Sequence, residues 1–260
     1  MNIVVLAKQV PDPEAYVEIT ADGKNIEIEQ KFSSNLFDEV ALEEALRIRE
    51  KHGGKVKVIS LGNERAIEVL RTGISMGADE ALLLEDQAFQ NGDGMSTALA
   101  LSKAVALEPF DIILCGRQAI DDDRGEIGPM VAQFLGLPHV GNIIKLDVEA
   151  TAAVAESPIE GGREVVEVAL PAVFTAERGL NEPRTPPITG VMKAMRAVIA
   201  RATPADLGLS AGQIGLEGSK VRIVRYTSPR RRPDVRLIPG EPAEAAAEAA
   251  RLLVDVEKVI

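Results

Sequence analysis

Short apolar runs alternate with amphipathic segments through the first half of the chain. The apolar runs are rich in valine, isoleucine and leucine, which is typical of parallel strands buried on both faces. The segments between them repeat apolar residues at helical spacing, and Asn35 stands where the first of them needs an N-cap. The predicted strands are residues 2–8, 55–62, 80–86 and 111–116, and the predicted helices are residues 35–52, 64–78, 94–108 and 127–136.

This order of elements predicts an α/β fold with a Rossmann-like, mostly parallel sheet and helices on both of its faces. Ligands of such folds bind at the carboxyl ends of the strands. Three of the predicted strands end at residues 7–8, 61–62 and 116–117, so we expect these positions to form the walls of a pocket.

The pattern changes in the second half of the chain. Alternating apolar and polar positions over residues 140–177, broken by glycine and proline, are typical of antiparallel strands. A basic helix is predicted over residues 191–202 and an alanine-rich helix over residues 242–258. The alanine-rich helix has little bulky core of its own, so we expect it to dock elsewhere. We therefore predict an α/β domain over residues 1–200 and a C-terminal arm over residues 201–260.

Composition narrows the range of partners. The chain has 260 residues and a formal net charge of -11, and only 3% of its residues are aromatic. The acidic charge argues against nucleic acid as a partner, and so does the scarcity of side chains that stack on bases. The single cysteine, Cys115, excludes an intrachain disulfide, and no apolar stretch is long enough to cross a bilayer. We expect no membrane insertion and a location in the cytoplasm, or in the mitochondrial matrix of a eukaryote.

Three consecutive aspartates at residues 121–123 precede the helix predicted from Ile127, and their role has three interpretations. They could bind a hard cation, but adjacent residues do not point at one ion, and no metal site is predicted. They could favour the positive end of the helix. Alternatively, Gly125 and Gly128 could bring backbone N–H groups close to an anion, so that the aspartates border a nucleotide. Neither histidine has a spacing typical of catalysis, and no catalytic residue is predicted.

A loop stiffened by prolines lies within residues 170–197. Leu180 stands at its expected tip, and Lys193 and Arg196 follow on the basic helix. An exposed apolar anchor with a basic rim is typical of a protein-docking element. The alternative is a connector whose leucine packs into its own core.

Four segments of the chain resemble the β subunit of electron-transfer flavoproteins, and the similarity extends over nearly the whole chain. They are residues 5–12, 35–51, 116–136 and 170–194, of which the last is the most specific because it holds an Asn-Glu-Pro-Arg core at residues 181–184. The resemblance implies a heterodimer with an α subunit that holds most of the redox FAD at the interface. It also implies an electron carrier, which has no substrate-transforming site of its own. Such a carrier takes electrons from acyl-CoA dehydrogenase-type flavoenzymes and passes them to a quinone-linked acceptor.

The resemblance further implies a buried AMP in this chain and a docking loop over residues 176–195, centred on Leu180. The implied nucleotide-binding residues are Leu6, Ala7, Asn35, Leu36, Phe37, Asp38, Leu61, Gly116, Gln118, Asp121, Asp122, Asp123, Arg124, Gly125, Glu126, Ile127 and Gly128. The implied docking residues are Leu180, Asn181, Glu182, Pro183, Arg184, Lys193 and Arg196.

Two alternatives to this interpretation stay open. Electron-bifurcating, NADH-dependent members of the family hold a second FAD in place of AMP and tend to have a glycine within the aspartate loop. Residues 121–126 lack that glycine and carry added charge, so AMP is favoured. The other alternative is a non-redox adenine-nucleotide-binding module. Thr185 and residues 192–197 depart from the aromatic and lysine-rich pattern of the family, so we expect a different choice of partner.

Overall fold

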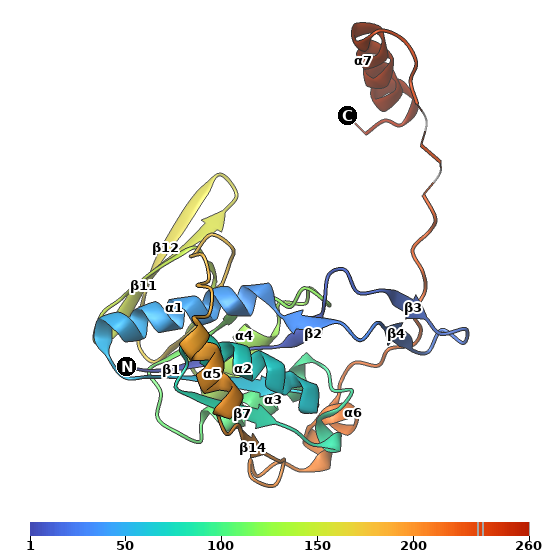
Figure 1. The fold of residues 1–260 in the computed structure, drawn as a ribbon. Helices are drawn as coiled ribbons and strands as arrows, with labels where there is room; N and C mark the ends of the chain where they lie inside the picture. The colour runs from blue at the N-terminus through green and yellow to red at the C-terminus, as the bar shows by residue number, and fades with distance from the viewer. Residues whose placement is uncertain (233, 236, 260) are drawn as a thin grey trace.

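The chain folds around a seven-stranded sheet in which every neighbouring pair of strands is parallel (Figure 1). The computed structural model describes residues 1–232, 234–235 and 237–259. The four strands predicted in the first half lie side by side in this sheet, which confirms the predicted fold class. In sheet order the strands are β14 (Ala200–Ala202), β7 (Glu80–Leu84), β6 (Lys55–Leu61), β1 (Asn2–Leu6), β8 (Ile112–Gly116), β13 (Ala172–Ala176) and β9 (His139–Ile143).

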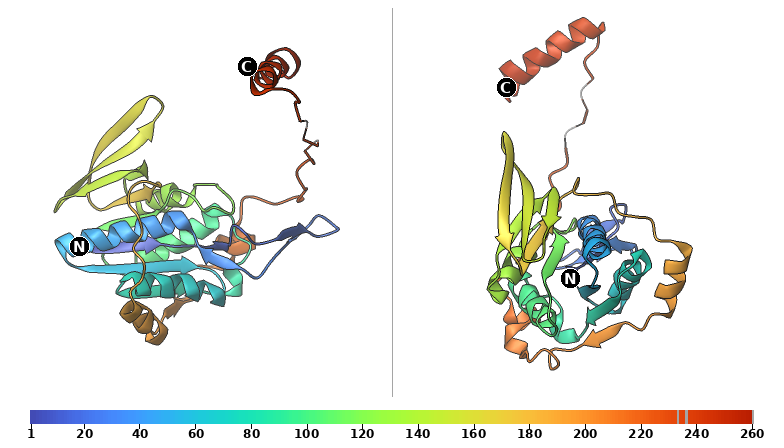
Figure 2. Two further views of the ribbon diagram at one scale, coloured as in Figure 1. Left: turned by 45° about the horizontal axis from the view of Figure 1, so that its top comes forward. Right: turned by 90° about the vertical axis from the view of Figure 1, so that its left-hand side faces the viewer.

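Helices cover both faces of the sheet, so the apolar core forms two clusters (Figure 2). Strand β1 shows the division, because Ile3 and Val5 belong to one cluster and Val4 and Leu6 to the other. Helices α1, α2 and α5 contribute to the first cluster, and α3 and α4 to the second. The helices are α1 (Leu36–His52), α2 (Ile67–Met76), α3 (Gly94–Val105), α4 (Ile127–Leu135), α5 (Ile188–Arg196), α6 (Gly215–Gly218) and α7 (Pro242–Arg251), with 3-10 turns at Glu64–Ala66, Gln87–Phe89 and Ala211–Gln213 and a π-helical segment at Leu252–Val256.

The prediction of antiparallel strands over residues 140–177 is only partly right. Strands β10 (Lys145–Val148), β11 (Ala152–Ile159) and β12 (Gly162–Ala169) form a separate antiparallel sheet. The strands on either side of them, β9 and β13, join the parallel sheet instead. All five residues of β13 are buried, because this strand lies between β8 and β9 with packing on both faces. Alternation in the sequence could not separate these two kinds of strand.

Two small ribbons lie beside the main sheet. β3 (Val17–Ile19) and β4 (Ile26–Ile28) form a hairpin around the pair Asp22-Gly23, which is typical of such turns, and β2 (Gln9–Pro11) pairs with β5 (Phe32–Ser34). The predicted basic helix is shorter than expected and begins earlier: α5 spans Ile188–Arg196, and residues 200–202 form the edge strand β14.

The chain continues to pack on the core beyond residue 200. Leu207, Leu209 and Ile214 are buried in the second cluster, and the extended arm begins only after Val221. Figure 1 shows the arm carrying α7 away from the core, and no residue of α7 is buried. Within the described residues, no helix has the length and hydropathy needed to span a membrane.

Candidate functional site

A cavity of about 300 Å³ lies where the carboxyl ends of β1, β6 and β8 meet, which is the edge that the sequence predicted. The strand ends, the N-terminus of α1 and the loop before α4 all contribute to its walls. The predicted nucleotide-binding residues that line it are Leu6, Ala7, Asn35, Asp38, Leu61, Gly116, Gln118, Asp122, Arg124, Gly125, Glu126, Ile127 and Gly128. The structure thus brings most of the predicted residues together, although whether they bind a nucleotide stays a prediction.

Four predicted residues do not line the cavity: Leu36, Phe37, Asp121 and Asp123. Phe37 packs against the lining residue Arg117, whose guanidinium carbon lies 5.4 Å from the centre of the Phe37 ring. Gly116 allows this close approach of β8 to α1, because a Cβ at that position would lie 2.5 Å from the Cβ of Phe37.

Two side chains at the start of α1 fasten the loops around the cavity. The carboxylate of Asp38 accepts one hydrogen bond from the backbone N–H of Lys8 and one from that of Gly116, each at 2.8 Å. Asn35 occupies the predicted N-cap position, but its side chain does not cap the helix. Its amide instead donates to the carbonyl of Gln118 at 2.9 Å and accepts from the N–H of Ile120 at 3.2 Å. Burial raises the pKa of Asp38 to about 6, although the two backbone donors favour its charged form.

The three consecutive aspartates have separate partners. Lys8 Nζ lies 2.8 Å from a carboxylate oxygen of Asp121 and 3.3 Å from one of Asp122. Asp123 has a left-handed backbone (φ 52°) and accepts from the side chain of Gln118 at 2.7 Å. These contacts close the loop against the end of β1, so repulsion among the aspartates is offset by cations and amide donors. Within the described residues, no group of three or more His, Cys, Asp or Glu is arranged to hold a metal ion.

The loop after the aspartates leads into α4, whose N-cap residue Glu126 makes no side-chain cap hydrogen bond. The first N–H groups of α4 therefore lack a side-chain acceptor, and Ile127 and Gly128 line the cavity. Gly125 has φ 63°, which explains a glycine at this turn. The expectation that Gly128 brings a backbone N–H group close to an anion stays a prediction, but this glycine also has a packing role. A Cβ there would lie 2.3 Å from Thr175 Cγ2, so this glycine allows α4 to pack on the sheet.

One wall of the cavity was not predicted from the sequence. Residues 92–94 and Thr97, which lie at the end of the loop after β7 and in the first turn of α3, line it. One carboxylate oxygen of Asp93 caps the N-terminus of α3. The other accepts hydrogen bonds from the backbone N–H groups of Lys220 and Val221 at 2.6 and 3.1 Å. Burial alone would raise the pKa of Asp93, but these donors and Ser96 lower it to about 2. The Asp-Gly pair after the third strand was the available signal. Other lining residues outside the predicted set are Lys8, Ile59, Leu101, Cys115, Arg117 and Ala119.

The expected exposure of Leu180 is wrong. Leu180 is half-buried and packs against the first core cluster. The exposed apolar residues of this region lie on α5 instead, where the side chains of Ile188, Val191, Met192 and Met195 follow one another at helical spacing. Ile188 is 82% exposed and Met195 is 73% exposed.

The other predicted docking residues differ in their surroundings. Asn181 and Arg184 bond to α1, whereas Glu182 and Pro183 are exposed. Lys193 and Arg196 are exposed on α5, and the ammonium group of Lys193 donates to the carbonyl of Ala78 at 3.2 Å.

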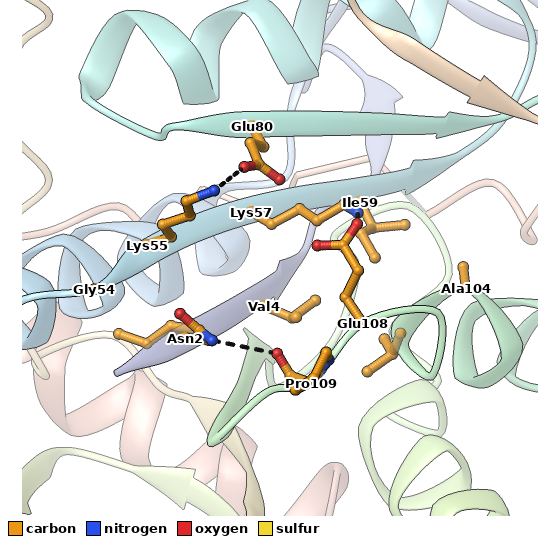
Figure 3. A pocket seen from close by; sticks show the side chains of 12 residues that line it. Asn2, Val4, Gly54, Lys55, Lys57, Ile59, Glu80, Ala104, Glu108 and Pro109 are labelled. Carbon is orange, nitrogen blue, oxygen red and sulfur yellow. Dashed lines mark hydrogen bonds and ion pairs between the residues drawn. The ribbon is translucent and has the colours of Figure 1, made fainter.

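A hollow of about 530 Å³ lies at the opposite edge of the sheet, at the amino ends of β1 and β6 (Figure 3). Lys55 pairs there with Glu80 at 2.7 Å, and Lys57 pairs with Glu108 at 2.5 Å. Both lysines already have carboxylate partners, and parallel sheets bind ligands at the other edge. The cavity of about 300 Å³ at the carboxyl edge is therefore the better candidate site, although it is the smaller of the two.

The fold and the cavity define a class: α/β proteins with a ligand cavity at the carboxyl edge of a parallel sheet. The chain belongs to the electron transfer flavoprotein family, because the model of the electron transfer flavoprotein domain matches residues 25–207 and close relatives cover nearly its full length. This confirms the resemblance.

Three relatives show how far the similarity extends. The electron transfer flavoprotein subunit beta of Thermoanaerobacterium thermosaccharolyticum is 42% identical over 94% of this chain and 95% of the relative. The subunit beta of Bacillus subtilis is 36% identical over 100% of both chains. A subunit of the caffeyl-CoA reductase-Etf complex of Acetobacterium woodii, CarD, is 36% identical over 92% of both.

Proposed function

We propose that this chain is the β subunit of a heterodimeric electron carrier. A partner α subunit holds most of a redox FAD at the interface, and this chain holds one AMP as a structural ligand. When bound, the flavin accepts electrons from an acyl-CoA dehydrogenase-type flavoenzyme and passes them to a quinone-linked acceptor. The residues of this chain bind the nucleotide, help to enclose the flavin and orient the donor protein.

The observation that carries the nucleotide part is that the N-terminus of α4, without a side-chain cap, opens into a cavity at the carboxyl edge of the sheet. Free N–H groups and the helix dipole favour a phosphate there. Lys8 and Arg124 also line the cavity, but Lys8 is paired with Asp121 and Asp122 and Arg124 with Glu126, so the backbone N–H groups carry the argument for a phosphate. A volume of about 300 Å³ lies at the lower end of the range for small-molecule sites, which favours a mononucleotide over a second FAD.

The docking part rests on α5. An apolar stripe on a solvent-facing helix, with Lys193 and Arg196 on the same helix, has the form of a protein-binding surface. We call the side chains of Ile188, Val191, Met192 and Met195 the docking face. The exposed cations favour an acidic partner surface and affect the association rate more than the affinity.

The nucleotide content of the heterodimer tests the first part. We expect one FAD and one AMP per heterodimer when the assembled protein is denatured and its nucleotides are separated. Thr97→Phe should fill the cavity and lower AMP to roughly a tenth, with FAD retained. Met95→Phe, on an exposed position of the same helix, is the matched control and should keep AMP. Two FAD and no AMP would contradict the proposal in favour of the bifurcating alternative, and no flavin at all would favour a non-redox module.

Deleting residues 241–260 tests the role of the arm. Because α7 buries nothing on the core and Leu253, Val254 and Val256 beyond it are exposed, we expect this segment to pack on the α subunit. The deletion should weaken association of the two subunits about tenfold or more and lower FAD per β chain. AMP should stay bound, since its cavity is remote from α7. A heterodimer that is replete in flavin and of unchanged affinity would show that the arm is dispensable.

A further inference from the structure

Arg184 is enclosed by two carboxylates of α1. Its Nε donates to Glu43 at 2.7 Å and its Nη2 to the other oxygen of Glu43 at 3.1 Å. Its Nη1 donates to Glu50 at 2.5 Å, and its backbone N–H also donates to Glu43 at 3.2 Å. All three guanidinium nitrogens are therefore engaged within this chain. Bidentate pairs of this kind fix geometry more strictly than single contacts do.

Glu43 makes this contact stronger than an ordinary surface pair. Only 4% of its side chain is exposed, and a buried carboxylate is tolerated only when it is well paired. Its partners are Arg184 from the loop and Arg47 from one turn further along α1, at 2.8 Å. Burial alone would raise the pKa of Glu43, but the two arginines bring it below its usual value. Glu43 in turn holds the pKa of Arg184 above its usual value.

Asn181 makes a second attachment to the same helix. Its amide nitrogen donates to the carbonyl of Val40 at 3.0 Å and to a carboxylate oxygen of Glu44 at 2.9 Å. The contacts of Asn181 and Arg184 therefore extend from Val40 to Glu50, about 15 Å of helix. Two attachments so far apart fix the direction of the loop as well as its position. In the described chain, all side-chain hydrogen bonds of residues 181–187 end on α1.

The docking face begins at Ile188, four residues after Arg184. The opposite side of α5 packs on α2, where Ala194 is buried and a Cβ at Gly190 would lie 2.1 Å from the carbonyl oxygen of Ser75. The loop and the helix are thus held at both ends, by α1 before Ile188 and by α2 after it.

From this geometry we propose that Asn181 and Arg184 are positioning residues that clamp the docking face of α5 to α1. They act on the partner only through α5 and do not contact it. Since Asn35 and Asp38 at the start of α1 hold the nucleotide cavity, this helix sets the placement of both sites. The proposal rests on the proposed docking role of α5.

The test compares two arginines that share one carboxylate. Arg184→Gln removes the clamp, whereas Arg47→Gln removes only the contact of Glu43 within α1. Both variants are assembled with the α subunit. Electron transfer is measured from an acyl-CoA dehydrogenase reduced with butyryl-CoA, and hydrogen exchange is measured for residues 181–196. For Arg184→Gln we expect an apparent KM for the carrier raised about three- to tenfold at unchanged kcat, FAD and AMP, and faster exchange in that segment. For Arg47→Gln we expect values close to wild type.

Each outcome decides between the claims. Wild-type KM and exchange in Arg184→Gln, with KM raised by Ile188→Ala, would overturn the clamp and leave the docking role intact. If neither variant raises KM, the docking role itself is wrong. Loss of AMP or FAD in Arg184→Gln would show a general structural role and would also overturn the clamp. If Arg184→Gln does not assemble, Glu50→Gln takes its place, because it removes only the exposed half of the clamp. Hydrogen exchange over residues 184–196 should then still be faster than in wild type. Unchanged exchange in this variant would refute the proposal.

Discussion

Replacing Asp38 with alanine is expected to abolish AMP retention and to lower the free energy of unfolding by about 2–6 kcal/mol. The backbone N–H groups of Lys8 and Gly116 lose their shared acceptor, and each donor left unpaired away from water costs about 1–3 kcal/mol. The loops that close the cavity lose their attachment to α1 at the same time. AMP content after denaturation and the midpoint of urea unfolding measure the two effects.

A neighbouring acid on the same helix provides the control. Glu39 lies outside the lining of the cavity, so Glu39→Ala should keep AMP. Retention of AMP by Asp38→Ala, with a stability loss under about 1 kcal/mol, would show that the carboxylate is not the fastening that we describe.

The pH dependence of Asp38 gives an independent measurement. The folded chain raises the pKa of Asp38 from 3.8 to about 6, so the folded state binds a proton more tightly than the unfolded state does. The resulting stabilisation is full below pH 4 and disappears as pH rises through about 6, with a total of roughly 3 kcal/mol. Asp38→Asn cannot titrate, so its stability relative to wild type should improve by up to that amount between pH 4 and pH 7. A constant difference across this range would contradict the assignment.

Ile188→Ala is expected to raise the apparent KM for the carrier by about 10- to 150-fold in electron transfer from its dehydrogenase. Full burial of an aliphatic side chain of this size contributes about 1.5–3 kcal/mol, which converts to that range of affinity. Ile188 is exposed in the free chain, so its replacement should leave the fold, the FAD and the AMP unchanged. Steady-state transfer at low and high salt also separates this apolar effect from the steering by Lys193, which should weaken with salt.

Leu180→Ala is the informative comparison. Leu180 packs on the core, so its loss should lower stability by about 1–2 kcal/mol, less than at a fully buried leucine, and change KM only indirectly. A large KM increase for Leu180→Ala together with a wild-type KM for Ile188→Ala would show that Leu180, and not Ile188, anchors the partner.

The fold and most of the cavity could be predicted because they depend on local patterns. Apolar runs predict the buried strands, and the residues that follow each run, such as Gly116, predict where the strand ends and its loop begins. The wall at residues 92–94 lies in the loop between β7 and α3, where the pair Asp93-Gly94 before the helix was the signal in the sequence.

Other errors could not be avoided from sequence alone. Leu180 and Ile188 are both aliphatic residues in the same proline-containing segment, and only the tertiary fold decides which of them packs inside. Likewise, Asn35 satisfies the pattern of an N-cap, yet its side chain forms hydrogen bonds with the loop at residues 118–120. The sequence does not show whether such a side chain bonds to its own helix or to a distant loop. The packing role of Gly128 was also not predicted, since a glycine near a ligand and a glycine under a packed helix look alike in sequence.

The extended arm also bears on how a cell would regulate the amount of this protein. In the described chain, the residues between Ser219 and Glu241 form no helix or strand, and Arg222, Arg225, Arg230, Arg231 and Arg232 are exposed among them. Before assembly such a stretch is an open substrate for proteases that cleave at basic residues, whereas a partner that covers it would protect it. Unassembled copies would then be degraded faster than assembled ones, so turnover would match the abundance of the chain to the supply of its partner.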